Sequence, residues 1–131
     1  MVHVLHLTEL SRWRTGEDVE ADSLRTEGFL HASPDAATMV AVANAFYSEP
    51  AEPLIVLVVD TEKVDAEVRW EAADPTPPPG VSGDVLFPHV YGPIPRPAVC
   101  ALRRLVRDPR GRFTALETVM EPGPCLQTSD R

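Results

Sequence analysis

The sequence has few cysteines, and their placement excludes two common classes of small protein. Cys100 and Cys125 lack the paired spacing of a zinc motif, and two cysteines are too few for a disulfide framework. Because Cys100 lies in an apolar segment, we expect it to be a buried, inert thiol.

Basic residues are scarce. The chain has 12 Lys and Arg against 20 Asp and Glu, a formal net charge of −8. Nucleic acids and anionic membranes bind positively charged surfaces, so neither is expected as a partner. The bulk charge still allows one local basic pocket for a phosphate.

Long apolar runs are absent as well. The longest, Leu54–Val59, is far too short to cross a bilayer. Residues 1–6 are too short and have the wrong flanks for a signal peptide, and they predict a strand instead. These features together predict a cytoplasmic protein.

What is present is an ordinary globular composition, with 44% hydrophobic and 24% charged residues in 131. That length fits one domain. The patterned segments end near Glu117, so we predict a single domain over residues 1–117. Residues 118–131 are polar, contain two prolines and a glycine, and are predicted to be a disordered tail.

The apolar patterning predicts an α+β domain with a mostly antiparallel sheet and one main helix. Leu54–Val59 shows no alternation, which is typical of a central strand buried on both faces. Pro88 restricts the strand around it to an edge or a bulge. Residues 74–83 hold four prolines and two glycines and predict an irregular loop. The predicted strands are 2–7, 29–31, 54–59, 68–71, 86–91, 98–106 and 112–116.

The main helix is predicted to begin at Ser33 and to end before Pro50, with Ser33 as N-cap and Pro34 in the first turn. Such a helix start beside His31 would form a seat for a phosphate or carboxylate. The alternative is that His31 is simply hydrogen-bonded at a strand end. Two helical fragments are predicted near the start, at 9–14 with Thr8 as cap and at 23–27 before Gly28.

The residues with reactive side chains are His6, His31, His89 and Glu71, with Tyr91 nearby, all at predicted strand ends or loops. They lack H-x-x-x-H or H-E-x-x-H spacing, so no metal is expected. No G-x-S-x-G elbow marks a nucleophilic serine. Glu71 shares a face with Arg69, so a simple ion pair is the alternative to a functional role.

Several segments resemble a bacterial family called domain of unknown function 952. The resemblance extends over about residues 2–116, and the pieces G-F-L-H-A-S and F-P-H-V-Y-G are its most specific parts. The matching segments are His6–Thr8, Trp13, Ser23–Ser33, Arg69–Glu71 and Phe87–Pro93.

That family is similar in fold and motif order to the ADP-ribosyltransferase superfamily, which binds NAD in the cleft of a split β-sheet. The resemblance implies that His6 holds the adenosine ribose, that His31 lies beside the nicotinamide and that Glu71 is the catalytic glutamate. His31 and Glu71 are thus the predicted catalytic residues. The predicted ligand contacts are His6, Thr8, Ser23, Ser33, His89 and Tyr91.

The implied function is binding of NAD or an ADP-ribose-type nucleotide, with ADP-ribosyl transfer to a protein acceptor or NAD glycohydrolysis as the candidate reaction. Cleavage of the nicotinamide–ribose bond passes through an oxocarbenium-like state that a fixed carboxylate stabilises. A non-catalytic small-ligand sensor using the same cleft is the alternative, and a histidine-lined metal-dependent hydrolase is a third. The sequence leaves open whether the protein is an enzyme.

Overall fold

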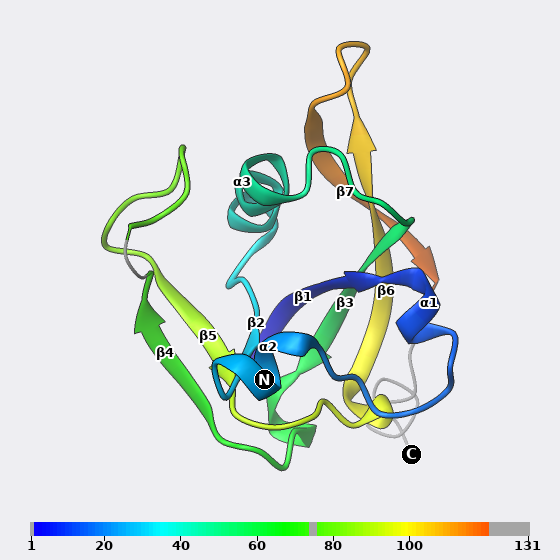
Figure 1. Cartoon of the computed structure of the whole chain (residues 1–131), viewed down its shortest axis with the longest axis vertical. Coiled ribbons are helices and arrows are strands. Elements are labelled where there is room, and N and C mark those ends of the chain that lie inside the picture. Colours follow the sequence, from blue (N-terminus) through cyan, green and yellow to red (C-terminus); the bar gives the residue numbers. More distant parts are fainter. Residues whose placement is uncertain (1, 74–75, 121–131) are drawn as a thin grey trace.

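In a computed structural model, which describes residues 2–73 and 76–120, the chain folds into two antiparallel β-sheets and one main helix (Figure 1). The four-stranded sheet has the order β1-β3-β6-β7 and the three-stranded sheet the order β2-β5-β4. This confirms an α+β domain with a mostly antiparallel sheet. The strands are β1 (His3–Glu9), β2 (Leu30–His31), β3 (Leu54–Asp60), β4 (Val68–Ala72), β5 (Leu86–Val90), β6 (Val99–Arg107) and β7 (Phe113–Met120).

The helices are short apart from one. The main helix α3 (Ala36–Phe46) packs against β7 and β1, whereas α1 (Leu10–Trp13) and α2 (Asp22–Thr26) lie in the long connection between β1 and β2. Two 3₁₀ turns, η1 (Thr61–Lys63) and η2 (Arg96–Ala98), follow β3 and precede β6. No helix within the described ranges is long and apolar enough to pass through a membrane.

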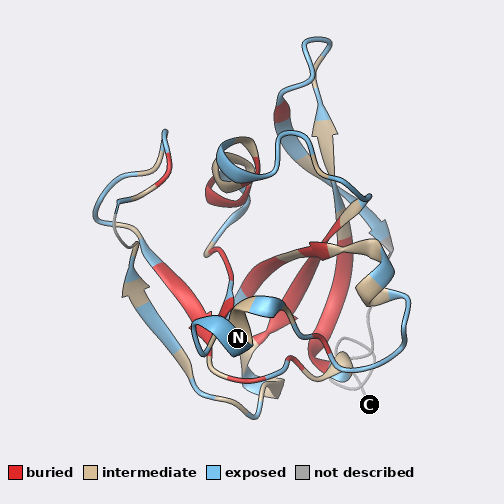
Figure 2. Cartoon of the chain, viewed as in Figure 1, coloured by how far each residue is buried: buried red, intermediate tan, exposed pale blue. Residues whose placement is uncertain are grey.

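Strand β3 is the centre of the larger sheet, between β1 and β6, and all of its residues after Leu54 are buried (Figure 2). Leu57 and Val59 face one hydrophobic cluster, and Val56 and Val58 face a second one that includes Met39 of α3. The prediction of a central strand buried on both faces is therefore confirmed.

One face of the three-stranded sheet packs into the same hydrophobic cluster as Leu57 and Val59. Leu30 of β2 and Val90 of β5 are fully buried there. Because side chains alternate along a strand, His31 and His89 project from the opposite face. Beyond β2, Ser33 and Leu5 of β1 exchange two backbone hydrogen bonds of 2.7 and 2.9 Å, which join the two sheets.

That pairing overturns the predicted start of the main helix. Ser33 is buried and its backbone is bonded to Leu5, so it is not the N-cap. The N-cap is Asp35, whose carboxylate accepts the N–H of Thr38 at 2.8 Å. A carboxylate at the helix start repels anions, so the helix does not form the predicted seat for a phosphate beside His31.

Pro88 was expected on an edge strand or at a bulge, but β5 is the central strand of its sheet and pairs with both neighbours without a register shift. The carbonyl of Pro88 accepts the N–H of Ala32 at 3.1 Å. The N–H and C=O of one residue point to the same neighbouring strand. The missing N–H of Pro88 therefore faces the β2 side, where the partner strand is only two residues long, and pairing with Trp70 of β4 needs no donor from it.

Other boundaries also differ. Thr8 is a buried residue of β1 rather than a helix cap, and α1 starts at Leu10 without a side-chain cap. Strand β7 continues to Met120, past the predicted domain end at 117, because it pairs with the long β6. Residues 121–131 of the predicted tail lie outside the described residues, as do residues 74 and 75 of the predicted loop.

The cap of α3 gives a first test. Asp35→Ala should lower the free energy of unfolding by about 0.5–2 kcal/mol, because the N–H of Thr38 loses its acceptor. Urea denaturation measures this difference. Asp35→Asn, which keeps an acceptor oxygen, should retain most of the stability. Equal stabilities for the alanine variant and the wild type would contradict the assignment of Asp35 as cap.

Candidate functional site

The exposed face of the three-stranded sheet gathers most of the reactive residues. We call it the histidine face. Its two histidines are direct partners across the β2–β5 pair, and His89 is also the partner of Arg69 across the β5–β4 pair. Alternate residues of each strand share this face, together with the residue before β2 and the residue after β5. They are Phe29, His31, Arg69, Glu71, His89 and Tyr91.

Glu71 is the hydrogen-bonded centre of the histidine face. Its Oε1 accepts the hydroxyl of Tyr91 at 2.7 Å and lies 2.7 Å from Nδ1 of His89. A carboxylate can only accept, so Nδ1 of His89 carries the hydrogen. The two hydrogen bonds, that of Tyr91 first, hold the pKa of Glu71 below its ordinary value. The Glu71 side chain is therefore an anion at neutral pH.

The ring of His89 is fixed on a second side. Phe29 stacks on it, with ring centroids 4.1 Å apart and planes inclined by 21°. The ring of His31 meets the ring of His89 edge-on, with the two ring centroids 5.6 Å apart. Nε2 of His31 lies 3.0 Å from a carboxylate oxygen of Glu27. Each histidine thus has one ring nitrogen on a carboxylate, and the other nitrogen makes no hydrogen bond to the described residues.

Arg69 supplies positive charge at the edge of this face. An ion pair with Glu71 was the alternative to a functional role of that carboxylate, but both oxygens of Glu67 hold the Arg69 guanidinium at 3.0 Å. Its guanidinium carbon also lies 4.6 Å from the centre of the Tyr91 ring. The hydroxyl of Tyr91 has its pKa raised, chiefly by the hydrogen bond to Glu71. Glu71 is therefore held by a tyrosine and a histidine and not by a simple ion pair.

His6 lies behind the histidine face rather than on it. Its Nδ1 is 2.7 Å from the carbonyl oxygen of His31, so Nδ1 donates and Nε2 is the unprotonated nitrogen. Nε2 is buried and has no partner among the described residues. Burial lowers the pKa of His6, because the charged ring would leave an N–H without an acceptor in the core.

The structure brings four of the predicted residues together, namely His31, Glu71, His89 and Tyr91. Thr8 is buried in β1 on the same side as His6, and Ser33 is buried at the junction of the two sheets. Ser23 lies in α2, where its hydroxyl makes no hydrogen bond to the described residues of the histidine face. None of these three belongs to the histidine face.

Sequence analysis missed Phe29 and Glu27 as members of the site. Phe29 was predicted only as a residue of the strand 29–31, yet it is partly exposed and contacts His31, His89 and Tyr91. Its spacing of two from His31 places both on one side of a strand, a signal that was available. Glu27 precedes His31 by four residues and reaches it around the turn at Gly28, whose φ of +93° favours glycine.

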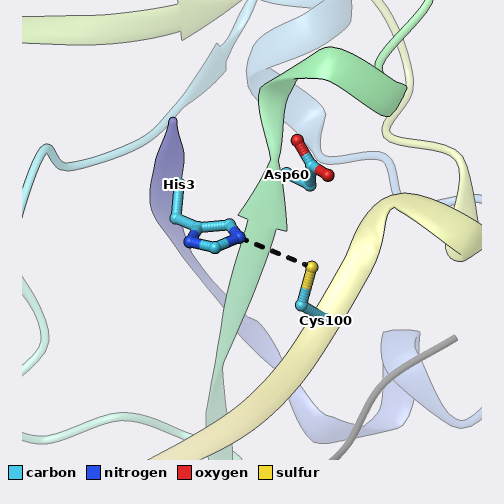
Figure 3. Close-up of side chains that lie close together, drawn as sticks. All are labelled: His3, Asp60 and Cys100. Atoms are coloured by element: carbon cyan, nitrogen blue, oxygen red, sulfur yellow. Dashed lines mark hydrogen bonds between the residues drawn. The ribbon is translucent and has the colours of Figure 1, made fainter. Parts of the chain in front are cut away.

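A second group of potential metal ligands lies apart from this face. Ligand atoms of His3, Asp60 and Cys100 all lie within 4.8 Å of one another (Figure 3). Cys100 is buried as predicted, but it is disulfide-bonded, so the prediction of a thiol was wrong. Cysteine spacing alone could not reveal a pairing that depends on the fold.

The chemistry available on the histidine face is that of a fixed anion beside two oriented imidazoles, with a phenol and an aromatic ring around them. Such groups bind hydroxyls and phosphates through nitrogen and oxygen donors and acceptors. The carboxylate can also stabilise positive charge that develops on a bound molecule.

Comparison with known proteins tests the expected relationship. The family model described as Protein of unknown function (DUF952) matches residues 4–102, which include the whole histidine face. The chain belongs to the DUF952 family. No curated protein matches this DUF952 chain.

Solved structures show the same fold. The crystal structure of CC0527 from Caulobacter crescentus matches with a TM-score of 0.62 and 22% identity, over 86% of the DUF952 chain described here and 94% of CC0527. The solution NMR structure of CC0527 matches with a TM-score of 0.59 and 23% identity, over 85% of this chain and 90% of CC0527. The DUF952 prediction is thus confirmed, and the similarity to ADP-ribosyltransferases stays a prediction.

The buried His6 should make stability depend on pH. The unfolded chain protonates this histidine near its ordinary pKa of 6.5, whereas burial lowers the pKa in the folded chain, so that the folded chain takes up the proton only at a lower pH. The free energy of unfolding should therefore fall as the pH drops below 6.5, by up to about 1.4 kcal/mol per pH unit from this group. His6→Gln should remove this component. His3→Gln, which alters an exposed histidine, is the control in metal-free urea denaturation from pH 7 to 5.

The hydrogen bond from Tyr91 gives another test. Tyr91→Phe should raise the pKa of Glu71 towards its ordinary value, as measured by NMR titration of the side-chain carboxyl. The stabilisation linked to the lowered pKa is present above the ordinary glutamate pKa and is lost as the pH falls through the folded-state pKa. The variant should therefore lose stability near neutral pH and differ little in strong acid. An unchanged Glu71 titration would contradict the role of Tyr91.

Proposed function

We propose that the histidine face binds NAD or an ADP-ribose-type nucleotide and that Glu71 stabilises the ribose when the nicotinamide–ribose bond breaks. The observation that carries this proposal is the Glu71 carboxylate, anchored by Tyr91 and His89 on a partly exposed face. In a reaction of this kind the C–N bond to nicotinamide breaks, and the ribose carbon then bonds to water or to a protein side chain. The positive charge that develops on the ribose is what a fixed anion favours.

The position of Glu71 suits that role. Both hydrogen bonds reach the same oxygen, Oε1, and no donor among the described residues reaches Oε2, which can therefore accept from a ligand. The lowered pKa keeps the group charged without any change in its surroundings during the reaction. Preorganisation of this kind favours a charge that appears only in the transition state, and therefore affects the rate more than ground-state binding.

The other residues supply contacts that a dinucleotide needs. The second nitrogens of His31 and His89 can hydrogen-bond to ribose hydroxyls or phosphates. Phe29 and Tyr91 offer ring surface to a planar base. Arg69 is the positively charged residue of the histidine face, two residues before Glu71. Because its ion pair with Glu67 is exposed and contributes little stability, Arg69 can release Glu67 and bind a phosphate instead.

His6 has a different role in this proposal from the one that the superfamily resemblance implies. Its ring is buried and its Nδ1 holds the carbonyl of His31. It therefore positions β2 and the His31 side chain rather than contacting the adenosine ribose. The acidic composition of the chain is consistent with a small nucleotide and does not favour RNA.

The experiment measures NAD affinity and nicotinamide release for the wild type and for Glu71→Gln, with and without protein acceptors. The variant keeps the size of the side chain and removes its charge. If Glu71 stabilises the ribose cation, kcat should fall by about 10²-fold or more, with NAD affinity little changed. Glu117 of β7 pairs with Arg104 of β6, away from the histidine face, so Glu117→Gln is the matched control and should leave both quantities unchanged.

Two other outcomes would change the conclusion. A wild type that binds NAD or ADP-ribose and never releases nicotinamide would indicate a non-catalytic sensor, and Glu71→Gln would then alter only affinity, by about 1–2 kcal/mol. A wild type whose melting temperature is unaffected by NAD and ADP-ribose would contradict nucleotide binding altogether, because any ligand of the folded state raises it.

A further inference from the structure

We propose that His3, Asp60 and Cys100 form a zinc site that is closed by the disulfide at Cys100 and opens when that disulfide is reduced. The three residues come from neighbouring strands of the four-stranded sheet, at the end where β3 leads into η1 (Figure 3). The site lies outside the histidine face and does not depend on the function proposed for it.

The fold fixes these side chains on one face. His3 and Asp60 are direct partners across the β1–β3 pair, two residues from Leu5 and Val58, which belong to one hydrophobic cluster. Alternation along both strands places all four on the same side. The β3–β6 register shifts between Val58 and Val59, and Cys100 is the residue that this irregularity leaves between Val99 and Ala101.

The distances suit a tetrahedral metal. Nε2 of His3 lies 3.7 Å from Sγ of Cys100. Zinc bonds of about 2.3 Å to sulfur and 2.0–2.1 Å to nitrogen, at a tetrahedral angle, separate these two ligands by about 3.6 Å. Ligand atoms of His3, Asp60 and Cys100, one from each, lie within 4.8 Å of one another, so the three side chains can share one metal ion. A water molecule can then take the fourth position.

Burial adds a second reason. Asp60 is only 1% exposed, and one of its oxygens accepts the backbone N–H of Glu62 at 2.9 Å. A buried carboxylate next to an imidazole and a sulfur is the donor set that zinc prefers, whereas magnesium prefers oxygen alone. The hydrogen bond from Glu62 orients the carboxylate as outer partners of metal ligands commonly do.

The redox step sets when zinc can bind. A dithiol or phosphine reductant supplies two electrons, and with two protons the disulfide becomes two thiols. The Cys100 thiol then loses its proton as its sulfur bonds to Zn²⁺. Oxidation by a disulfide reverses both steps and releases the metal. Reducing compartments keep cysteines as thiols, so zinc binding is the expected state there.

The test uses the full chain, zinc and a phosphine reductant that does not compete for the metal. The reduced wild type should bind about one zinc per chain by equilibrium dialysis, and the oxidised wild type should bind at least about tenfold more weakly. Cys125→Ser, which removes the only other cysteine of the sequence, should bind zinc without any reductant. Co²⁺ in place of zinc should give a thiolate-to-metal charge-transfer band, which reports the sulfur ligand directly.

Variants locate the metal. His3→Ala, at an exposed strand end, and Asp60→Asn, which keeps the acceptor for Glu62, should each lose zinc binding and the cobalt band. His31→Ala is the matched control and should keep both, because it removes a histidine of the histidine face. Equal zinc binding by oxidised and reduced protein would overturn the proposal, as would binding that is lost in His31→Ala and retained in His3→Ala. So would a Cys125→Ser protein that folds by circular dichroism and takes up no zinc.

Discussion

The exchange of two backbone hydrogen bonds between Leu5 and Ser33 is the constraint on which the site depends. It joins β1 of the larger sheet to the chain just beyond β2, and the carbonyl of His31 is held beside it by His6. With β2 fixed in this way, Leu30 is directed into the core and His31 to the opposite face. The short strand β2 would have little stability alone, because two residues form few cross-strand contacts. The position of His31 therefore comes from the larger sheet.

Much of this architecture could be predicted from the sequence. The unbroken apolar run at 54–59 identified the central strand, and alternation placed Arg69 and Glu71 on one face of β4. The start of α3 could not be predicted, because Ser33 and Asp35 are both good caps and only the pairing with Leu5 decides between them. The position of the strand that contains Pro88 was also mispredicted, because it too depends on pairing between strands. A single sequence does not show which side of a strand its missing N–H will face.

The sequence predicted which residues belong to the site better than it predicted their hydrogen-bond partners. His31, Glu71, His89 and Tyr91 were identified from residue type and from the family resemblance, and they do share one face. The alternative of an Arg69–Glu71 pair could not be decided from the sequence, because Arg69 and Glu71 share a strand face and sequence cannot rank Arg69 against a histidine and a tyrosine from β5 and the residue after it. The burial of His6 depends on how the two sheets meet, which no local pattern encodes.

The strict alternation of the three-stranded sheet has a consequence for how such chains can diverge. Every residue of the histidine face carries an odd number, whether it lies on β2, β4 or β5 or directly beside them, while Leu30 and Val90 between them are buried in the core. Inserting or deleting one residue within β5 would send His89 inward and Val90 outward, so a single such event would remove the site and expose the core together. A change of length in the segment between β4 and β5 does not alter which side chains of the strands face the core. Natural length variation should therefore accumulate there, and pairs of compensating insertions should be rare within the strands themselves.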